Sequence, residues 1–230
     1  MTTLMSYLAG FGLAASSGAK AFIPVLLLGL AHYTDYFELS EKYLWIADPV
    51  VMTILAVLVL VEIVVDAHPE LGELSDHVAY LPKAVGGFIA FAAATGEVHD
   101  SLLELSASGL LGAATASGVH WVRNTLRRPF RQSVEGVHES AGKLASLGEA
   151  GVATGVAGAA VVVPPLSLLL LGAVGAGAAV VLRMAGARRV RCRHCGGMIR
   201  PGALVCIHCG REQRPGENAR DAAAESADGV

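Results

Sequence analysis

The sequence predicts an all-α protein: a polytopic helix bundle in a membrane, followed by a small zinc ribbon. Three observations lead to this prediction. Of the 230 residues, 53% are hydrophobic and 16% are charged, with a mean hydropathy of +0.55, whereas soluble domains have about 25% charged residues. Glycine and alanine dominate the apolar stretches, as in closely packed membrane helices. All four cysteines lie together near the C-terminal end.

Six apolar segments approach the ~20 residues that a membrane-spanning helix needs. They are Leu4–Leu30, Pro49–Val65, Ala84–Gly96 (extended towards Tyr80), Leu102–Val122 and the two halves of Gly148–Leu182. The first is interrupted by the run Ser16–Lys20 and by Pro24, and Asp48 before Pro49 is a helix-start signal for the second. Pro164-Pro165 divides the last stretch into two short spans or kinks one long helix.

Arginine is concentrated after the fourth and sixth segments. These residues are Arg123, Arg127, Arg128 and Arg131, then Arg183, Arg188, Arg189, Arg191 and Arg193. Because cytoplasmic loops carry an excess of basic residues, the pattern predicts a multi-pass protein of the inner (plasma) membrane with both termini in the cytoplasm. That compartment is reducing, as free cysteines require.

Four regions are expected: a transmembrane helical domain (1–183), a basic linker (184–191), a zinc ribbon (192–210) and a disordered tail (211–230). A weak repeat relates Gly12–Lys20 to Gly112–His120. If the repeat is real, the bundle consists of two three-span halves of inverted orientation. In transporters built this way, glycine-interrupted segments at corresponding positions of the two halves indicate a binding site. The alternative is a chance match between helices rich in small residues.

The cysteines form two pairs, Cys192-Arg-His-Cys195 and Cys206-Ile-His-Cys209. This spacing is typical of two zinc knuckles, in which four thiolates close the coordination shell of a structural zinc ion. A glycine follows each pair, as expected where the backbone turns with positive φ. A redox dithiol pair is the alternative. His194 and His208, inside the knuckles, are expected to be exposed and not to be ligands.

Charged residues inside the apolar segments are candidates for an ion pathway, because such residues are costly in a bilayer. Glu62 and Asp66 lie one turn apart on one helix face, and Lys20 follows Ser17 and Gly18 at the interrupted first segment. Either acid is a natural counter-ion for Lys20. The alternatives are an interfacial Asp66, a Glu62 that reaches water, and an ion pair that only holds the bundle together.

His120 corresponds to Lys20 in the repeat and could carry protons, although an interfacial histidine beside Trp121, itself an interfacial anchor, is favoured. The segment 66–83 holds further acids and histidines, without a metal-binding spacing. A solvated acidic face is favoured there. No nucleotide-binding or catalytic motif is found, so an enzyme is not expected.

The stretches Ser17–Pro24 and Glu62–Pro69, together with Asp76, Pro82 and His120–Arg123, resemble a bacterial membrane family known as domain of unknown function 4126, over residues ~8–182. That family typically has Arg or Lys where this chain has Lys20, and the second half of the chain is more divergent. The resemblance implies a compact multi-span bundle and marks Lys20, Glu62 and Asp66 for testing, but implies no activity. The C-terminal module separately resembles the zinc-ribbon family.

Two functions follow as expectations. The first is a small transporter or channel-like protein for an ion or small solute. The second is a membrane-anchored interaction or scaffold protein that acts through its zinc ribbon. The expected partners are the lipid bilayer, the ion or solute, a cytoplasmic protein at the ribbon and a second copy of the chain; a net charge of −3 gives no nucleic-acid signal.

Overall fold

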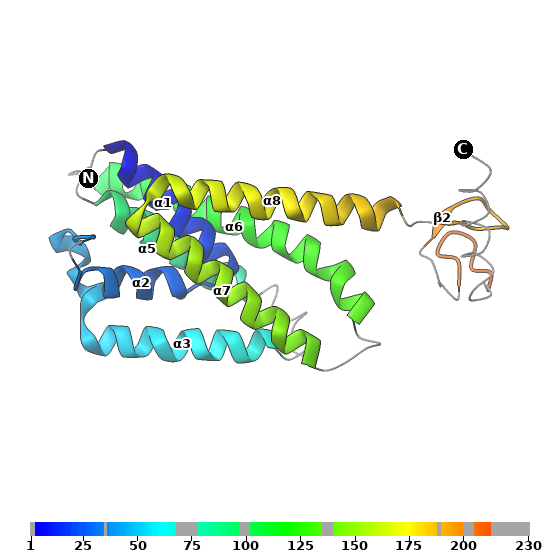
Figure 1. Ribbon diagram of the computed structural model, residues 1–230, viewed down its shortest axis with the longest axis horizontal. Coiled ribbons are helices and arrows are strands. Elements are labelled where there is room, and N and C mark those ends of the chain that lie inside the picture. The colour runs from blue at the N-terminus through cyan, green and yellow to red at the C-terminus, as the bar shows by residue number, and fades with distance from the viewer. Residues whose placement is uncertain are drawn as a thin grey trace. The chain divides into compact units, whose positions relative to one another are not determined.

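A computed structural model describes residues 3–34, 36–67, 78–96, 102–134, 140–187, 190–199 and 205–212. The chain divides into two compact units, residues 1–175 and residues 176–230. The described part of the first unit is helical, which confirms the all-α prediction. Its helices are α1 (Thr3–Ala19), α2 (Ile23–Ala31), the short 3-10 helix η1 (Glu41–Ala47), α3 (Pro49–Ala67), α5 (Tyr80–Thr95), α6 (Leu102–Val134), α7 (Ser140–Val162) and the first half of α8 (Pro164–Ala187), as Figure 1 shows.

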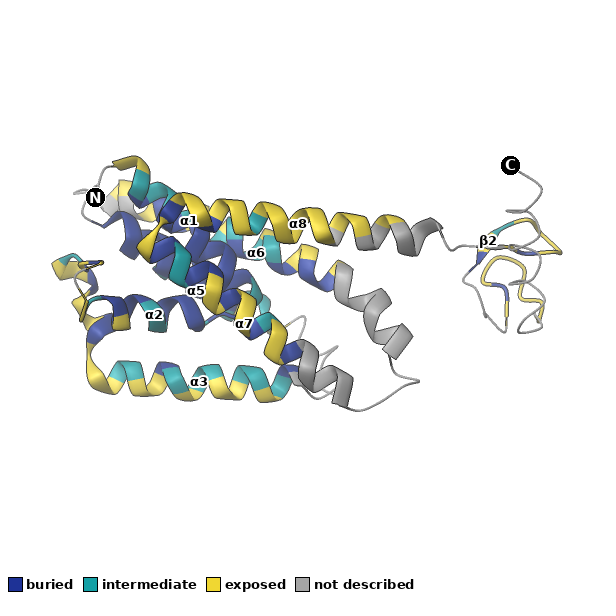
Figure 2. Cartoon of the chain, in the orientation of Figure 1, coloured by how far each residue is buried: buried dark blue, intermediate teal, exposed yellow. Residues whose placement is uncertain are grey.

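The centre of this bundle is formed by α1 and α5, which are largely buried in Figure 2. Small residues allow the helices to approach closely there. A Cβ atom on Gly87 of α5 would lie 2.7 Å from the carbonyl oxygen of Gly112 in α6. The fully buried ring of Phe91 packs edge-on against Phe11 of α1, with centroids 5.0 Å apart. The close approach of α5 to α6 therefore depends on the absence of a side chain at Gly87.

The first apolar segment is broken, as predicted, and the break covers residues 20–22 between α1 and α2. Pro24 lies in the first turn of α2, where its missing N–H costs no helical hydrogen bond. The hydroxyl of Ser17 donates to the carbonyls of Ala21 (3.0 Å) and Lys83 (3.3 Å). The break is thereby tied to the start of α5.

The last apolar stretch forms two helices that meet at Val163, because Pro164 begins α8. The second copy of the predicted repeat, Gly112–His120, lies within α6. This helix continues without interruption through Ser117 and His120, so it contains no counterpart of the α1–α2 break. The physical reason is that no proline follows His120 closely, whereas Pro24 follows Lys20.

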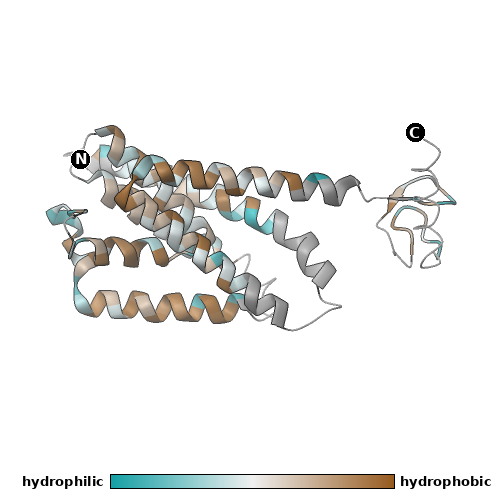
Figure 3. Ribbon diagram, in the orientation of Figure 1, coloured by the Kyte–Doolittle hydropathy of each residue, from teal (hydrophilic) through white to brown (hydrophobic). Residues whose placement is uncertain are grey.

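The number of membrane spans stays a prediction. Among the described residues, one helix is long and apolar enough to cross a membrane, over Pro49–Asp66 of α3. Shorter apolar helices cover Ser146–Val162 and Pro164–Gly177. Apolar side chains of α3 are exposed along much of its length, including Ile54, Val57 and Leu60. Figure 3 shows this helix as mostly hydrophobic.

The described part of the second unit contains a two-stranded antiparallel sheet, β1 (Val190–Arg191) with β2 (Met198–Ile199), and an isolated bridge between Val205 and Glu212. α8 continues to Ala187, through part of the stretch expected to be a linker. Gly196 and Gly210 both have φ of 69°, which confirms the positive φ expected after each cysteine pair.

Candidate functional site

Six charged side chains from five parts of the first unit converge in one place, here called the charged cluster. Its members are Lys20 from the α1–α2 break, Glu62 and Asp66 from α3, Lys83 from α5, Arg123 from α6 and Glu149 from α7. Three are cations and three are acids. Lys20 and Lys83 are among the most deeply buried side chains of the chain.

Asp66 binds two cations at once. One of its oxygens, Oδ2, lies 2.6 Å from the Lys20 ammonium and 2.8 Å from the Arg123 guanidinium. Arg123 also contacts Glu149 Oε2 at 2.6 Å, and Lys20 donates to the Ser146 hydroxyl at 3.4 Å. The Ser146 hydroxyl in turn donates to the carbonyl of Ile63. The carboxylate of Asp66 is therefore held between the α1–α2 break and α6.

Glu62 has a different environment, although it lies one turn before Asp66 on the same helix. Its Oε1 atom accepts a hydrogen bond from the backbone N–H of Ala21, at 3.0 Å, inside the α1–α2 break. The cation that contacts it is Lys83, whose Nζ lies 4.0 Å from the same oxygen. Its second oxygen, Oε2, is buried and has no hydrogen-bond partner among the described residues.

Lys83 is linked to a histidine. Its Nζ atom lies 3.0 Å from Nδ1 of His120, which is fully buried, and Nε2 of His120 lies 3.2 Å from Nδ2 of Asn124. Since an ammonium group only donates, Nδ1 must accept, and the neutral ring then carries its proton on Nε2. Rotating the Asn124 amide would place Oδ1, a buried oxygen without a partner among the described residues, where it accepts this proton.

The structure brings together most of the membrane residues predicted from the sequence. Lys20 pairs with Asp66, one of the two counter-ions expected, and the Ser17 hydroxyl contacts the backbone carbonyl of Lys83. Gly18 contributes space and no polar group: a Cβ there would lie 2.5 Å from the carbonyl oxygen of Ala116 in α6.

Two residues for which an interfacial position was considered are buried inside the bundle. His120 is fully buried between Lys83 and Asn124, and Tyr80 packs edge-on against its ring with centroids 4.5 Å apart. Asp66 is also buried, because two cations surround it. The other acids and histidines of the segment 66–83, namely His68, Glu70, Glu73, Asp76 and His77, lie outside the described residues.

Sequence reasoning missed Lys83 and Glu149 as site residues and read Arg123 only as an orientation signal. Each of the three lies near one end of an apolar segment, where charges are common. The available signal was their position: all three lie at the ends of segments that share a membrane side with Asp66 in the predicted topology.

The four cysteines of the second unit form a separate site. Their sulfur atoms all lie within 4.8 Å of one another, with 3.9 Å between Cys192 and Cys209 and 3.6 Å between Cys195 and Cys206. Tetrahedral zinc with Zn–S bonds of about 2.3 Å requires sulfur atoms about 3.8 Å apart. The cysteine cluster therefore fits a metal ion of this kind. His194 and His208 are exposed.

Two matching turns hold these sulfur atoms. The N–H of Gly196 donates to the carbonyl of Cys192, and that of Gly210 donates to the carbonyl of Cys206, both at 2.8 Å. Hydrogen bonds from the backbone N–H groups of Cys195 and His194 lower the pKa of the Cys192 thiol to about 6. The N–H of Gly197 acts in the same direction on Cys195, but desolvation and the neighbouring sulfur atoms outweigh it and raise the pKa of Cys195 to about 12. Four ionised thiolates can therefore lie this close together only when a metal cation compensates their charge.

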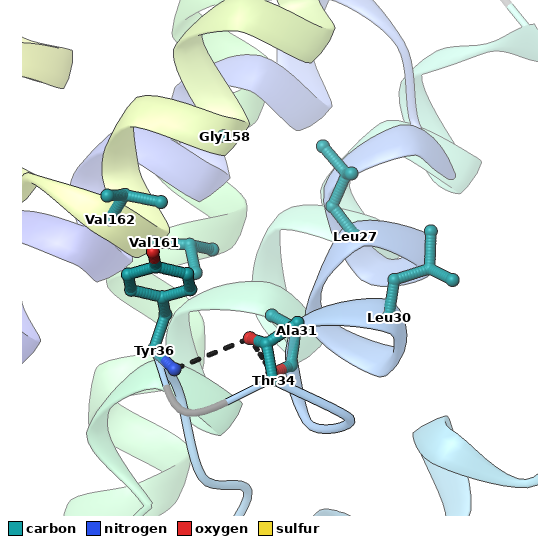
Figure 4. A pocket seen from close by; sticks show the side chains of 8 residues that line it. All are labelled: Leu27, Leu30, Ala31, Thr34, Tyr36, Gly158, Val161 and Val162. Carbon is teal, nitrogen blue, oxygen red and sulfur yellow. Dashed lines mark hydrogen bonds between the residues drawn. The ribbon is translucent and has the colours of Figure 1, made fainter.

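An apolar hollow of about 220 Å³ lies elsewhere in the first unit, between α2, the residues that follow it, and α7. Its lining includes Leu27, Leu30, Val161 and Tyr36, as Figure 4 shows. No member of the charged cluster lines it. Its lining is mostly apolar and includes no charged residue, and the Thr34 hydroxyl at its edge already donates to the carbonyl of Ala31.

These features define a helical protein with a buried charged cluster at a broken helix and a four-cysteine, metal-binding-type module. The chain belongs to the family described as domain of unknown function DUF4126, whose model matches residues 7–184. No curated protein and no solved structure matches the chain. The family match covers every member of the charged cluster and ends before the first cysteine.

Proposed function

We propose that the chain is an integral membrane protein that moves an ion or small polar solute at the charged cluster. The observation that carries the proposal is the convergence of six charged side chains at a helix break inside an apolar bundle. Four of them, Lys20, Asp66, Lys83 and Arg123, are buried, and Glu62 and Glu149 are partly buried. Charged residues in membrane segments usually mark ion pathways or substrate sites. Broken helices provide backbone N–H and C=O groups at the same depth, as in many transporters.

A membrane setting is supported by the apolar exterior. The stretch Pro49–Asp66 has the length and apolarity of a span. Large apolar side chains are also exposed on other helices, including Leu110 of α6, Val152 of α7 and Leu169 of α8. In water, exposed apolar surface of this extent would promote association, whereas in a bilayer it is the surface that contacts lipid. We further propose the inner membrane, with several spans and both termini in the cytoplasm.

A second candidate function is favoured by the cysteine cluster. A four-thiolate zinc site has no open coordination position, so its role is to hold a fold. A module this small then serves as a contact surface for a cytoplasmic protein, with the bundle as its anchor. Ile207 and Met198 expose apolar side chains on the described part of this module, which is consistent with a contact surface.

Ion flux in proteoliposomes separates the two candidates. The intact chain would be compared with Glu62→Gln and with Glu41→Gln, a matched change at an exposed residue of η1. Transport predicts a flux that Glu62→Gln removes and Glu41→Gln preserves. Absence of flux for every ion and solute tested, from wild-type protein that is folded and monodisperse, would contradict transport and favour the anchor.

A further inference from the structure

The two acids of α3 differ in how firmly their negative charge is held. Asp66 contacts Lys20 at 2.6 Å and Arg123 at 2.8 Å through one oxygen. Glu62 has Lys83 at 4.0 Å and one backbone N–H at 3.0 Å. When two carboxyl groups lie close together in different surroundings, the less compensated one takes up a proton first. In this pair that group is Glu62.

Glu62 also has a free position for the proton. Its Oε1 atom is engaged by the Ala21 N–H, while Oε2 is buried without a hydrogen-bond partner among the described residues. A buried acceptor without a partner is costly, and protonation removes its charge. By contrast, a metal cation needs several oxygen ligands, and the other two carboxylates of the cluster, Asp66 and Glu149, are already engaged with Lys20 and Arg123.

We propose that the ion carried by the charged cluster is the proton, and that it binds to Oε2 of Glu62. This inference rests on the proposed transport function and names its cargo or coupling ion. An O–H bond forms at Oε2 when water or hydronium on one side supplies a proton, and the same bond breaks when the proton is released to water on the other side. No electrons are transferred.

The neighbouring groups determine what protonation does. Those facing Glu62 or its partners are Lys20 from the break, Asp66 from α3, Lys83 and Tyr80 from α5, His120 and Arg123 from α6, and Glu149 from α7. When Glu62 becomes neutral, Lys83 loses its carboxylate neighbour but keeps the neutral His120 ring as acceptor at 3.0 Å. Lys83 is thus a positioning residue that keeps its contact with His120 in both states.

Protonation of Glu62 also weakens its contact with the α1–α2 break. The ionised carboxylate of Glu62 accepts the Ala21 N–H and places negative charge beside the start of α2, where it interacts favourably with the helix dipole. A neutral carboxyl group is a weaker acceptor. Proton uptake therefore loosens the contact between α3 and the α1–α2 break, and this loosening couples proton binding to a change in the bundle.

The test uses the full chain with its metal, reconstituted in lipid vesicles. A pH difference is imposed while potassium and valinomycin clamp the membrane potential, and a trapped dye reports the internal pH. Wild type and Glu41→Gln are expected to collapse the pH difference, and Glu62→Gln is expected to preserve it. In parallel, infrared spectra above about pH 6, where exposed carboxyl groups are ionised, should show a protonated carboxyl band that Glu62→Gln abolishes and Glu41→Gln retains.

The outcomes are distinguishable. A Glu62-dependent flux of another ion, without proton movement, would overturn the proton assignment and leave the transport proposal standing. Loss of the band in Glu62→Gln, but no flux of any species in wild type, would support proton binding and overturn transport. A carboxyl band that persists in folded Glu62→Gln would overturn the assignment to Glu62.

Discussion

The charged cluster and the cysteine cluster both concentrate charge in a small volume, but their compensating charges come from different sources. In the bundle, three cations and three acids from five parts of the first unit compensate one another within the chain. In the second unit, four sulfur ligands converge within 4.8 Å and need a cation from outside. This difference is the basis of the proposal that the bundle exchanges a proton on Glu62, its least compensated acid, whereas a four-thiolate site has no open coordination position once its metal is bound.

The largest expected effect is at the cysteine cluster. Cys206→Ser should remove metal binding altogether, because a three-thiolate site with one hydroxyl loses its closed shell and the small module depends on metal for folding energy. Metal content of the purified protein, measured by elemental analysis, should fall from one ion per chain to none. Thermal unfolding of the bundle should not change. Full metal content in this variant would contradict the assignment of Cys206 as a ligand.

The next effect is at the centre of the charged cluster. Asp66→Asn leaves Lys20 and Arg123 without their shared carboxylate, and breaking a buried ion pair costs about 3–5 kcal/mol. Unfolding in detergent should show this loss, while Glu38→Gln, a change at an exposed residue, should match wild type. A difference below about 1 kcal/mol, the value of a surface pair, would show that Asp66 is not buried between two cations.

A smaller effect concerns helix spacing. Gly87→Ala places a Cβ 2.7 Å from the carbonyl oxygen of Gly112, so α5 and α6 must separate, at a cost of about 1–3 kcal/mol. Gly155→Ala is the matched control, because a Cβ at Gly155 meets no described atom within 4 Å. This control should be neutral or stabilising, since alanine favours helices over glycine. Equal unfolding midpoints for the two variants would contradict the close approach.

The smallest effect is at the start of α3. Asp48 Oδ1 accepts hydrogen bonds from the N–H groups of Val50 (2.8 Å) and Val51 (3.3 Å). Removing such an N-cap costs about 1 kcal/mol. Asp48→Ala should lower the free energy of unfolding by that amount, and Asp48→Ser should restore most of it. Identical stability for the alanine and serine variants would show that the cap does not contribute.

The two sites also differ in how far the sequence predicted them. The cysteine cluster depends on residues close together in the chain, so its spacing and the glycine after each pair were enough to predict its geometry. The α1–α2 break was predictable for the same reason, because Pro24 acts locally and the Ser17 hydroxyl donates to the carbonyl of Ala21, four residues on.

The charged cluster depends on long-range packing. Lys20 with an acid of α3 was expected, but Lys83, Arg123 and Glu149 each resemble an ordinary charge at the end of an apolar segment. Nothing local distinguishes a buried charge from an interfacial one. The same limit explains His120, whose burial follows from the packing of α5 on α6 and not from its sequence neighbours.

The most direct test of the central claim compares the two regions in one experiment. Wild type, Glu62→Gln and Cys206→Ser would be reconstituted side by side, and proton flux would be measured in each. The account predicts that Glu62→Gln abolishes the flux and that Cys206→Ser retains it. Flux that survives in Glu62→Gln and disappears in Cys206→Ser would contradict it, because the cysteine cluster and not the charged cluster would then control transport.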